Sequence, residues 1–366
     1  MKIERVVISG GGTGGHIFPA IAIADAIKKR NPNAEIVFVG AIGKMEMEKV
    51  PAAGYTIYAL PIAGFQRKFT FSNFLLPLKI IKSLLLARSI LKKIKPQVVI
   101  GVGGYASGPT LKVAGWLNIP TLVQEQNSFP GKTNKLLAKN ASAICTAYEG
   151  LEAFFPKEKI SLTGNPVRFE MVNISGKRTE ASAHYQLDPS KKTILVIGGS
   201  LGAKTLNESV LNHYDLLLEH DVQVLWQSGK LYYKTILEKL EGKESNAIKL
   251  VEFIDRMDLA YALADVIISR AGAISVSELC LVKKPVILVP SPNVAEDHQT
   301  KNAMALVSKN AAILIKDNVA KEELVPAAIA LLKNEVLQES LSSEIGELGK
   351  PNATENIVDI VEKIAH

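Results

Sequence analysis

The strongest constraint on the fold is a rhythm of short β-branched runs that alternate with helical stretches along the whole chain. In the first half these runs lie at residues 6–8, 36–39, 98–100, 121–123 and 143–145. The rhythm restarts in the second half, at residues 193–197, 222–226, 248–251, 266–269, 286–289 and 312–315. Parallel strands are joined by crossover helices and are buried on both faces, so this pattern predicts an α/β chain with two parallel-sheet domains.

Length and turn-forming residues suggest where the domains begin and end. The chain has 366 residues, which suits two domains that each bury a core. Turn formers at 164–168, followed by a polar stretch to about residue 192, predict a hinge. We therefore expect an N-terminal domain at 1–164, a hinge at 165–192, a C-terminal domain at 193–340, and a helical segment at 341–366 that packs back on the N-terminal domain.

Composition excludes several classes of protein. Hydrophobic residues make up 47% and charged residues 22%, as in a globular protein, and no apolar run reaches the roughly 18 residues of a membrane span. The N-terminus has no signal-peptide pattern, so we expect a cytoplasmic chain. Cys145 and Cys280 lie far apart in apolar stretches, which predicts two buried thiols. The net charge of +7 favours an anionic partner.

In each half of the chain, a glycine-rich turn follows the first strand. Residues 10–16 read GGGTGGH and residues 198–202 read GGSLG, each directly before a helix. Glycines let a ligand approach the backbone and helix N-termini bind anions, so both turns predict phosphate or sugar sites, with Thr13, His16 and Ser200 as polar groups. The alternative is that the glycines only permit tight turns. NAD is disfavoured, because neither following strand ends in the acid that would bind its ribose.

The stretch SRAGAISVSE at 269–278 follows a strand of the second half and carries candidate nucleotide contacts. Glu278 can accept hydrogen bonds from both hydroxyls of a ribose. Its alternative role is a partner for the helix dipole, worth about 0.3–1 kcal/mol. No Asp-x-Asp occurs in the chain, so we expect neither a metal nor another cofactor. A leaving diphosphate would then be neutralised by helix ends and by Ser200, Arg168 or Arg270.

Motifs in a fixed order along both halves resemble one family. They are GGTGGH at 11–16, GGYASGP at 103–109, EQN at 125–127, GNPVR at 164–168, GGSLGA at 198–203, AISVSE at 273–278 and DHQTKNA at 297–303. Together they resemble the MurG family, the N-acetylglucosaminyltransferases of peptidoglycan synthesis. The resemblance implies a GT-B fold, in which two Rossmann-like domains face a central cleft. It also implies an inverting transfer of N-acetylglucosamine from UDP-N-acetylglucosamine to the C4 hydroxyl of undecaprenyl-diphosphate-linked muramyl pentapeptide.

The resemblance and the residue patterns together nominate the substrate-binding residues. They are Thr13, Gly14, Gly15, Asn127, Arg168, Ser200, Ile254, Arg270, Ala273, Ser277, Glu278 and Gln299. By the resemblance, the Ile254 backbone lies near uracil and Glu278 lies on the ribose. Gln124, Leu201 and Thr300 depart from the residues usual in the family, so we assign no phosphate or sugar contact to them.

An inverting transfer needs a base that takes the proton of the acceptor hydroxyl. His16 is the leading candidate, because an imidazole titrates close to neutrality and this one borders the first glycine-rich turn. Glu125 is the rival, since it follows a strand and precedes Asn127 in one loop. The alternative for His16 is that it only caps its helix or contacts a diphosphate. The alternative for Glu125 is that it only orients its loop.

Residues 67–95 include eight basic residues and no acidic one. On a helix from about residue 72, one apolar stripe can pack on the sheet, formed by Ile80, Leu84, Ala87, Leu91 and Ile94. A second stripe beside lysines suits an anionic bilayer surface, with Phe74, Leu75, Leu78, Lys79, Ile81, Lys82 and Leu85 as the expected contacts. The alternative is a wide buried face with solvated lysines. Nucleic acid is disfavoured, because no aromatic stacking platform accompanies the charge.

These observations predict a hexosyltransferase at the cytoplasmic face of the inner membrane, acting in cell-wall synthesis and hence in cell shape and division. Its expected partners are UDP-N-acetylglucosamine, the lipid-linked acceptor, an anionic membrane surface and other cell-wall synthesis proteins. Two alternatives remain open. One is another enzyme of the same fold, such as a UDP-N-acetylglucosamine 2-epimerase or a diacylglycerol glycosyltransferase, and the other is a non-catalytic nucleotide-sugar binder.

Overall fold

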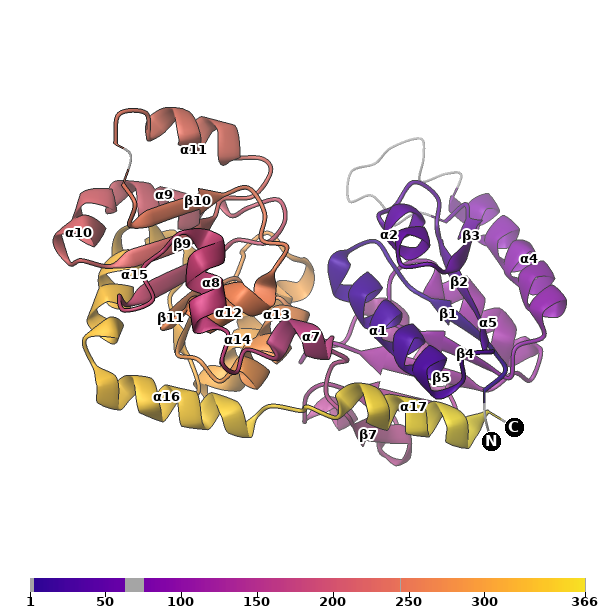
Figure 1. Ribbon diagram of the computed structural model, residues 1–366. Coiled ribbons are helices and arrows are strands. Elements are labelled where there is room, and N and C mark those ends of the chain that lie inside the picture. Colours follow the sequence, from indigo (N-terminus) through magenta and orange to yellow (C-terminus); the bar gives the residue numbers. More distant parts are fainter. Residues whose placement is uncertain (1–2, 63–75, 244, 366) are drawn as a thin grey trace. The chain divides into compact units, whose positions relative to one another are not determined.

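The computed structural model describes residues 3–62, 76–243 and 245–365, which form two compact units (Figure 1). The first unit consists of Met1–Val167 with Lys350–His366, and the second of Arg168–Gly349. Most of the stretch that the sequence assigned to a hinge therefore belongs to the second unit. The helix that ends at residue 347 belongs there too, and the chain crosses between the units a second time at residues 349–350.

Within the described residues, the first unit has a seven-stranded parallel sheet in the order β3-β2-β1-β4-β5-β6-β7. The strands are β1 (Arg5–Ser9), β2 (Glu35–Ala41), β3 (Thr56–Leu60), β4 (Val98–Gly101), β5 (Thr121–Glu125), β6 (Ala143–Thr146) and β7 (Ile160–Leu162). The helices are α1 (Gly14–Arg30), α2 (Glu46–Ala52), α4 (Leu76–Ile94), α5 (Ser107–Trp116), α6 (Lys132–Ala138) and α17 (Ala353–Ile364), with short 3₁₀ turns at Leu151–Ala153 and Lys157–Lys159.

Alternate side chains of β1 build two cores, one on each face of this sheet. Ile8 belongs to an apolar cluster with residues of α1 and α17, whereas Val7 belongs to a cluster with residues of α4 and α5. Although α17 is distant from α1 in the sequence, the two helices lie side by side (Figure 1). Arg30 of α1 fastens them, because its Nη1 lies 2.6 Å from Asp359 and 3.1 Å from Glu362.

The second unit repeats this architecture with a parallel sheet in the order β10-β9-β8-β11-β12-β13. Its strands are β8 (Thr193–Ile197), β9 (Gln223–Gln227), β10 (Ile248–Val251), β11 (Val266–Ser269), β12 (Val286–Leu288) and β13 (Ile313–Leu314). Its helices are α7 (Phe169–Val172), α8 (Arg178–Tyr185), α9 (Lys204–Asn212), α10 (Tyr214–Glu219), α11 (Tyr233–Lys239), α12 (Met257–Leu263), α13 (Ala273–Val282), α14 (His298–Val307), α15 (Asp317–Leu332) and α16 (Glu335–Glu347), with a 3₁₀ turn at Ala295–Asp297. The predicted fold class, two parallel α/β sheets in one chain, is confirmed.

The strand order of each sheet reverses beside its first strand. β1 lies between β2 and β4, and β8 lies between β9 and β11. Ligands of open α/β sheets bind outside the carboxyl ends of the strands at such a reversal. Both glycine-rich turns follow these two strands, so the topology places one candidate site in each unit.

Helix α4 covers the sheet with only one part of its surface. Ala87, Leu91 and Ile94 are buried, but Ile80, which the sequence assigned to the same stripe, is 40% exposed. That expectation was wrong, because the buried side of α4 begins one turn later, at Ser83. The second stripe faces solvent: Leu78, Ile81 and Leu85 are 64%, 55% and 63% exposed. Lys82 is exposed beside them and Lys79 is half-buried, whereas Phe74 and Leu75 lie outside the described residues.

Two further predictions concern burial and membrane insertion. Cys145 and Cys280 are buried, as predicted, and burial raises the pKa of each thiol to about 12. Across the described ranges, every helix lacks the combination of length and hydropathy that crossing a membrane requires.

Candidate functional site

In the first unit, the candidate site is built from two loops whose backbones touch. The turn after β1 leads into α1, and the turn after β4 leads into α5. Gly11 N–H donates to Gly103 O at 3.3 Å, and a Cβ on Gly104 would lie 2.4 Å from Gly11 O. Gly103 and Gly104 also have φ values of +94° and +87°, which side-chain-bearing residues rarely adopt. Glycine is therefore required where the two loops meet.

His16 lies in the first turn of α1, half-buried, with its ring against these loops. Its Nδ1 is 2.9 Å from Gly11 O. A carbonyl oxygen only accepts hydrogen bonds, so this contact is a hydrogen bond when Nδ1 carries the proton. In the neutral ring, Nε2 then holds the lone pair, and His16 can act as a base at that atom.

A buried carboxylate lies beneath the same turn. Glu46, the first residue of α2, is 1% exposed. Its Oε2 accepts from Gly12 N–H at 2.8 Å and its Oε1 from Ala41 N–H at 2.9 Å. The end of β2 and the glycine-rich turn are thus bound to one side chain.

Glu125, at the end of β5, is also buried and is surrounded by donors from the loop that follows it and from α6. It accepts from Asn127 N–H at 3.0 Å, Asn127 Nδ2 at 3.2 Å, Gly131 N–H at 3.1 Å and Asn134 Nδ2 at 2.8 Å. Gln126 joins this loop to the turn after β4, because its Nε2 donates to Val102 O at 2.7 Å. Thr13, Gly14, Gly15, His16, Glu125 and Asn127 thus lie on these connected loops or at the ends of the helix and strand that adjoin them.

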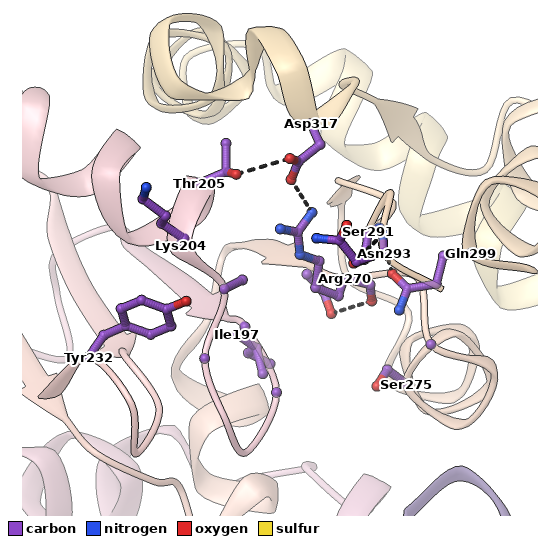
Figure 2. Close-up of a pocket in the computed structure, with 16 residues that line it drawn as sticks. Ile197, Lys204, Thr205, Tyr232, Arg270, Ser275, Ser291, Asn293, Gln299 and Asp317 are labelled. Carbon is purple, nitrogen blue, oxygen red and sulfur yellow. Dashed lines mark hydrogen bonds and ion pairs between the residues drawn. The ribbon is translucent and has the colours of Figure 1, made fainter. Parts of the chain in front are cut away.

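In the second unit, a cavity of about 440 Å³ opens beside the turn after β8 (Figure 2). It is lined by Ile197, Gly198, Gly199, Gly202, Ala203, Lys204, Thr205, Tyr232, Ser269, Arg270, Gly272, Ser275, Ser291, Asn293, Gln299 and Asp317. Of the substrate-binding residues predicted in this unit, Arg270 and Gln299 are in this lining, whereas Arg168, Ser200, Ile254, Ala273, Ser277 and Glu278 are not. Glycines of the turn and the N-terminus of α9 form one wall, which suits an anion.

Arg270 is engaged by groups of the protein itself. Its Nη1 is 2.5 Å from Asp317 Oδ1 and donates to the carbonyl oxygens of Val289, at 3.0 Å, and Pro290, at 3.2 Å. The other oxygen of Asp317 accepts from Thr205 Oγ1 at 3.0 Å (Figure 2). The arginine therefore joins β11, the end of β12 and the start of α15, and Asp317 offsets its charge. Gln299 likewise joins two segments, because its Oε1, at the start of α14, accepts from the N–H of Ser291, which follows β12, at 2.9 Å.

Glu278 projects from α13, partly exposed, and meets a buried phenol. Tyr261, which is 1% exposed, donates its hydroxyl to Glu278 Oε2 at 3.0 Å. Burial raises the pKa of the Glu278 carboxyl above its ordinary value, while the hydrogen bond from Tyr261 and the charge of Arg168 oppose that rise. Burial also raises the pKa of Tyr261 well above its usual value, so this hydroxyl stays a donor.

Comparison with known proteins identifies the family. Residues 6–146 match the glycosyltransferase family 28 N-terminal domain, and residues 193–357 match the glycosyltransferase family 28 C-terminal domain. The chain belongs to glycosyltransferase family 28.

Two full-length relatives of this family 28 chain carry the same name. A protein of Flavobacterium psychrophilum is 54% identical over 100% of this chain and 98% of its own, and one of Phocaeicola vulgatus is 56% identical over 99% and 96%. Each is named UDP-N-acetylglucosamine--N-acetylmuramyl-(pentapeptide) pyrophosphoryl-undecaprenol N-acetylglucosamine transferase. The crystal structure of Acinetobacter baumannii MurG is similar, with a TM-score of 0.79, 29% identity, and coverage of 98% of this chain and 99% of that one. The family resemblance predicted from the motifs is confirmed.

Several residues around the two candidate sites were not found from the sequence. Glu46 stands in a charged stretch that is typical of a surface helix, and no spacing relates it to the glycine-rich turn. Tyr261 lies within an apolar helix and has no polar neighbour in sequence that would mark it. Asp317 did have a signal, because it follows a strand of the second sheet at the edge where ligands bind.

Proposed function

We propose that this glycosyltransferase moves N-acetylglucosamine from UDP-N-acetylglucosamine to the C4 hydroxyl of undecaprenyl-diphosphate-linked muramyl pentapeptide, with inversion at the anomeric carbon. The observation that carries the proposal is identity of 52–56% with relatives of that name over almost the whole chain. The UDP-N-acetylglucosamine 2-epimerase of Neisseria meningitidis is 17% identical with a TM-score of 0.68, a likeness that concerns the fold alone.

His16 is assigned as the base of this reaction. When Nδ1–H donates a hydrogen bond to Gly11 O, the other ring nitrogen, Nε2, is able to take the proton of the C4 hydroxyl. The hydroxyl oxygen bonds to the anomeric carbon as the bond from that carbon to UDP breaks, and UDP leaves as the anion. A well-placed base contributes roughly 10²–10⁴-fold to the rate. The four hydrogen bonds that Glu125 accepts support a role in holding its loop.

The nucleotide is assigned to the second unit. The Glu278 carboxylate would accept the ribose hydroxyls, and the diphosphate would lie at the glycine turn and the N-terminus of α9. Since the oxygen of the Gln299 amide is used by Ser291, its NH₂ group is the end that would donate to the sugar. The remaining assignments rest on the motifs: Thr13, Gly14, Gly15, Asn127, Arg168, Ser200, Ile254, Arg270, Ala273 and Ser277.

A peripheral position at the cytoplasmic face of the inner membrane belongs to the same proposal. The exposed face of α4 formed by Leu78, Ile81 and Leu85 would enter the lipid interface, as supported by its exposure. Lys79 and Lys82 would each add about 1 kcal/mol on an anionic surface. Such a position would bring the enzyme to an acceptor that is itself anchored in the bilayer.

The test is a UDP-release assay with UDP-N-acetylglucosamine, the lipid-linked muramyl pentapeptide and EDTA. We expect release that depends on the acceptor, persists in EDTA, and falls at least a hundredfold in His16→Gln. Free UDP-N-acetylmannosamine would instead indicate an epimerase, and binding of the donor without turnover would indicate a non-catalytic binder. Either result would overturn the proposal.

A further inference from the structure

One peptide group of the first unit forms a hydrogen bond with a side chain at its N–H and with another side chain at its C=O. The N–H of Gly12 donates to Glu46 Oε2 at 2.8 Å, and the C=O of Gly11 accepts from His16 Nδ1 at 2.9 Å. These two groups belong to the same peptide bond. Peptide bonds in the described part of the chain are trans, so the N–H and the C=O point in opposite directions. A carboxylate, a peptide and an imidazole therefore form a continuous chain of hydrogen bonds.

We propose that Glu46 is a positioning residue that sets the orientation and tautomer of His16 through the Gly11–Gly12 peptide. The proposal rests on the assignment of His16 as the base. A carboxylate on the N–H side polarises the peptide and makes its carbonyl a stronger acceptor, because hydrogen bonds in series reinforce one another in a low-dielectric interior. The stronger acceptor holds the proton on Nδ1, which leaves the lone pair on Nε2.

The surroundings of Glu46 hold it in this position. Its second oxygen is bound by Ala41 N–H at 2.9 Å, and the residue is 1% exposed. A Cβ on Gly11 would lie 2.2 Å from the carboxylate, and one on Gly40 would lie 2.5 Å from its Cγ. Glycine at these two positions lets the side chain reach the peptide, and close contact on both sides prevents it from turning away.

The imidazole is confined on its other side as well. A Cβ on Gly103 would lie 2.9 Å from His16 Nε2, so the backbone of the turn after β4 borders the ring. A ring flip about Cβ–Cγ would exchange Nδ1 with Cδ2 and Nε2 with Cε1, which would break the hydrogen bond to Gly11 O and move Nε2 from the place it now occupies. The hydrogen-bond chain from Glu46 opposes that exchange and keeps one nitrogen available.

The test combines spectroscopy with kinetics on the full-length protein. Histidine ¹⁵N NMR shifts distinguish the two neutral tautomers, and the His16 signals are those that vanish in His16→Gln. We expect the Nδ1–H tautomer in the wild type and a larger share of Nε2–H in Glu46→Gln. We also expect kcat to fall roughly tenfold in Glu46→Gln, a part of the base contribution, with KM for UDP-N-acetylglucosamine unchanged within about twofold. Glu48→Gln is the matched control, since it makes the same change on the same helix at a side chain that is 78% exposed.

The outcomes separate this proposal from the function on which it rests. An Nε2–H tautomer in the wild type, or the wild-type tautomer in folded Glu46→Gln, would overturn the role of Glu46. The wild-type measurement tests the proposal even if Glu46→Gln does not fold. Full activity in His16→Gln would remove the base assignment instead, whatever the spectra of Glu46→Gln show.

Discussion

Replacing Tyr261 by Phe removes one hydroxyl from the second unit and tests how Glu278 meets the nucleotide. The phenol is 1% exposed and donates to Glu278 at 3.0 Å. Without this donor, the carboxylate loses a group that fixes its rotamer and favours its ionised form. Because the ribose hydroxyls would donate to that carboxylate, we expect Tyr261→Phe to weaken UDP binding.

The size of the effect follows from the charge of the acceptor. Hydrogen bonds to charged groups contribute about 1.5–3 kcal/mol, and Glu278 is partly exposed, so water replaces part of the loss. We take the lower value, about 1.5 kcal/mol, which is roughly a tenfold increase in Kd. The pKa of Glu278 is raised by burial, so its carboxylate is lost as the pH falls through that raised value and UDP binding weakens on acidification. In Tyr261→Phe this weakening should begin at a higher pH.

Isothermal titration with UDP and with 2′-deoxy-UDP provides the measurement. The variant should bind UDP about tenfold more weakly, and its preference for UDP over 2′-deoxy-UDP should shrink. Tyr185→Phe is the control, because it removes a second buried hydroxyl of the same unit, one that donates to Arg256 O at 3.0 Å. Wild-type UDP affinity in Tyr261→Phe, or an equal loss for both nucleotides, would refute the reasoning.

Three other predictions address separate parts of the molecule. Gly103→Ala puts a Cβ 2.9 Å from His16 Nε2 at a φ of +94°, so kcat should fall at least tenfold. The affinity for UDP, measured by calorimetry, should stay the same, and an unchanged kcat would contradict the prediction. Asp258 has its pKa held well below the usual value, chiefly by the hydrogen bond from Arg256, so its stabilisation is present above about pH 4 and lost on acidification. Asp258→Asn should therefore lower the urea midpoint at pH 7 and make less difference at pH 3, and a pH-independent difference would count against it. Ile81→Glu should reduce sedimentation with anionic vesicles without changing UDP binding, whereas equal sedimentation would argue against α4 as the lipid-binding face.

The architecture could be predicted because its signals are local. The β-branched runs before Gly10 and Gly198 are complete within a few residues, and both fold as the first strands of parallel sheets. Motifs of neighbouring residues, such as the glycine-rich turns, likewise identified the family. Periodicity was less reliable at the ends of elements, as Ile80 shows, since it cannot tell where a helix leaves the surface it covers.

The contacts around the sites depended on residues that are distant in sequence. Glu46 bonds to Gly12 across 34 positions, and Thr205 bonds to Asp317 across 112. Each of these pairs meets only after parallel strands have paired and their crossovers have closed. Arg270 was predicted to face the diphosphate from its residue type, but its charge is offset by a carboxylate whose proximity no motif indicated.

The return of α17 to the first unit has a consequence for the order in which the chain matures. Ile357, Val358 and Val361 have no exposed surface and complete an apolar cluster begun by β1 and α1. A ribosome finishes the second unit at Gly349, before it has made these residues. The first unit therefore waits until α17 has been synthesised, and the second unit, although it comes later in the chain, is able to close its core before the first.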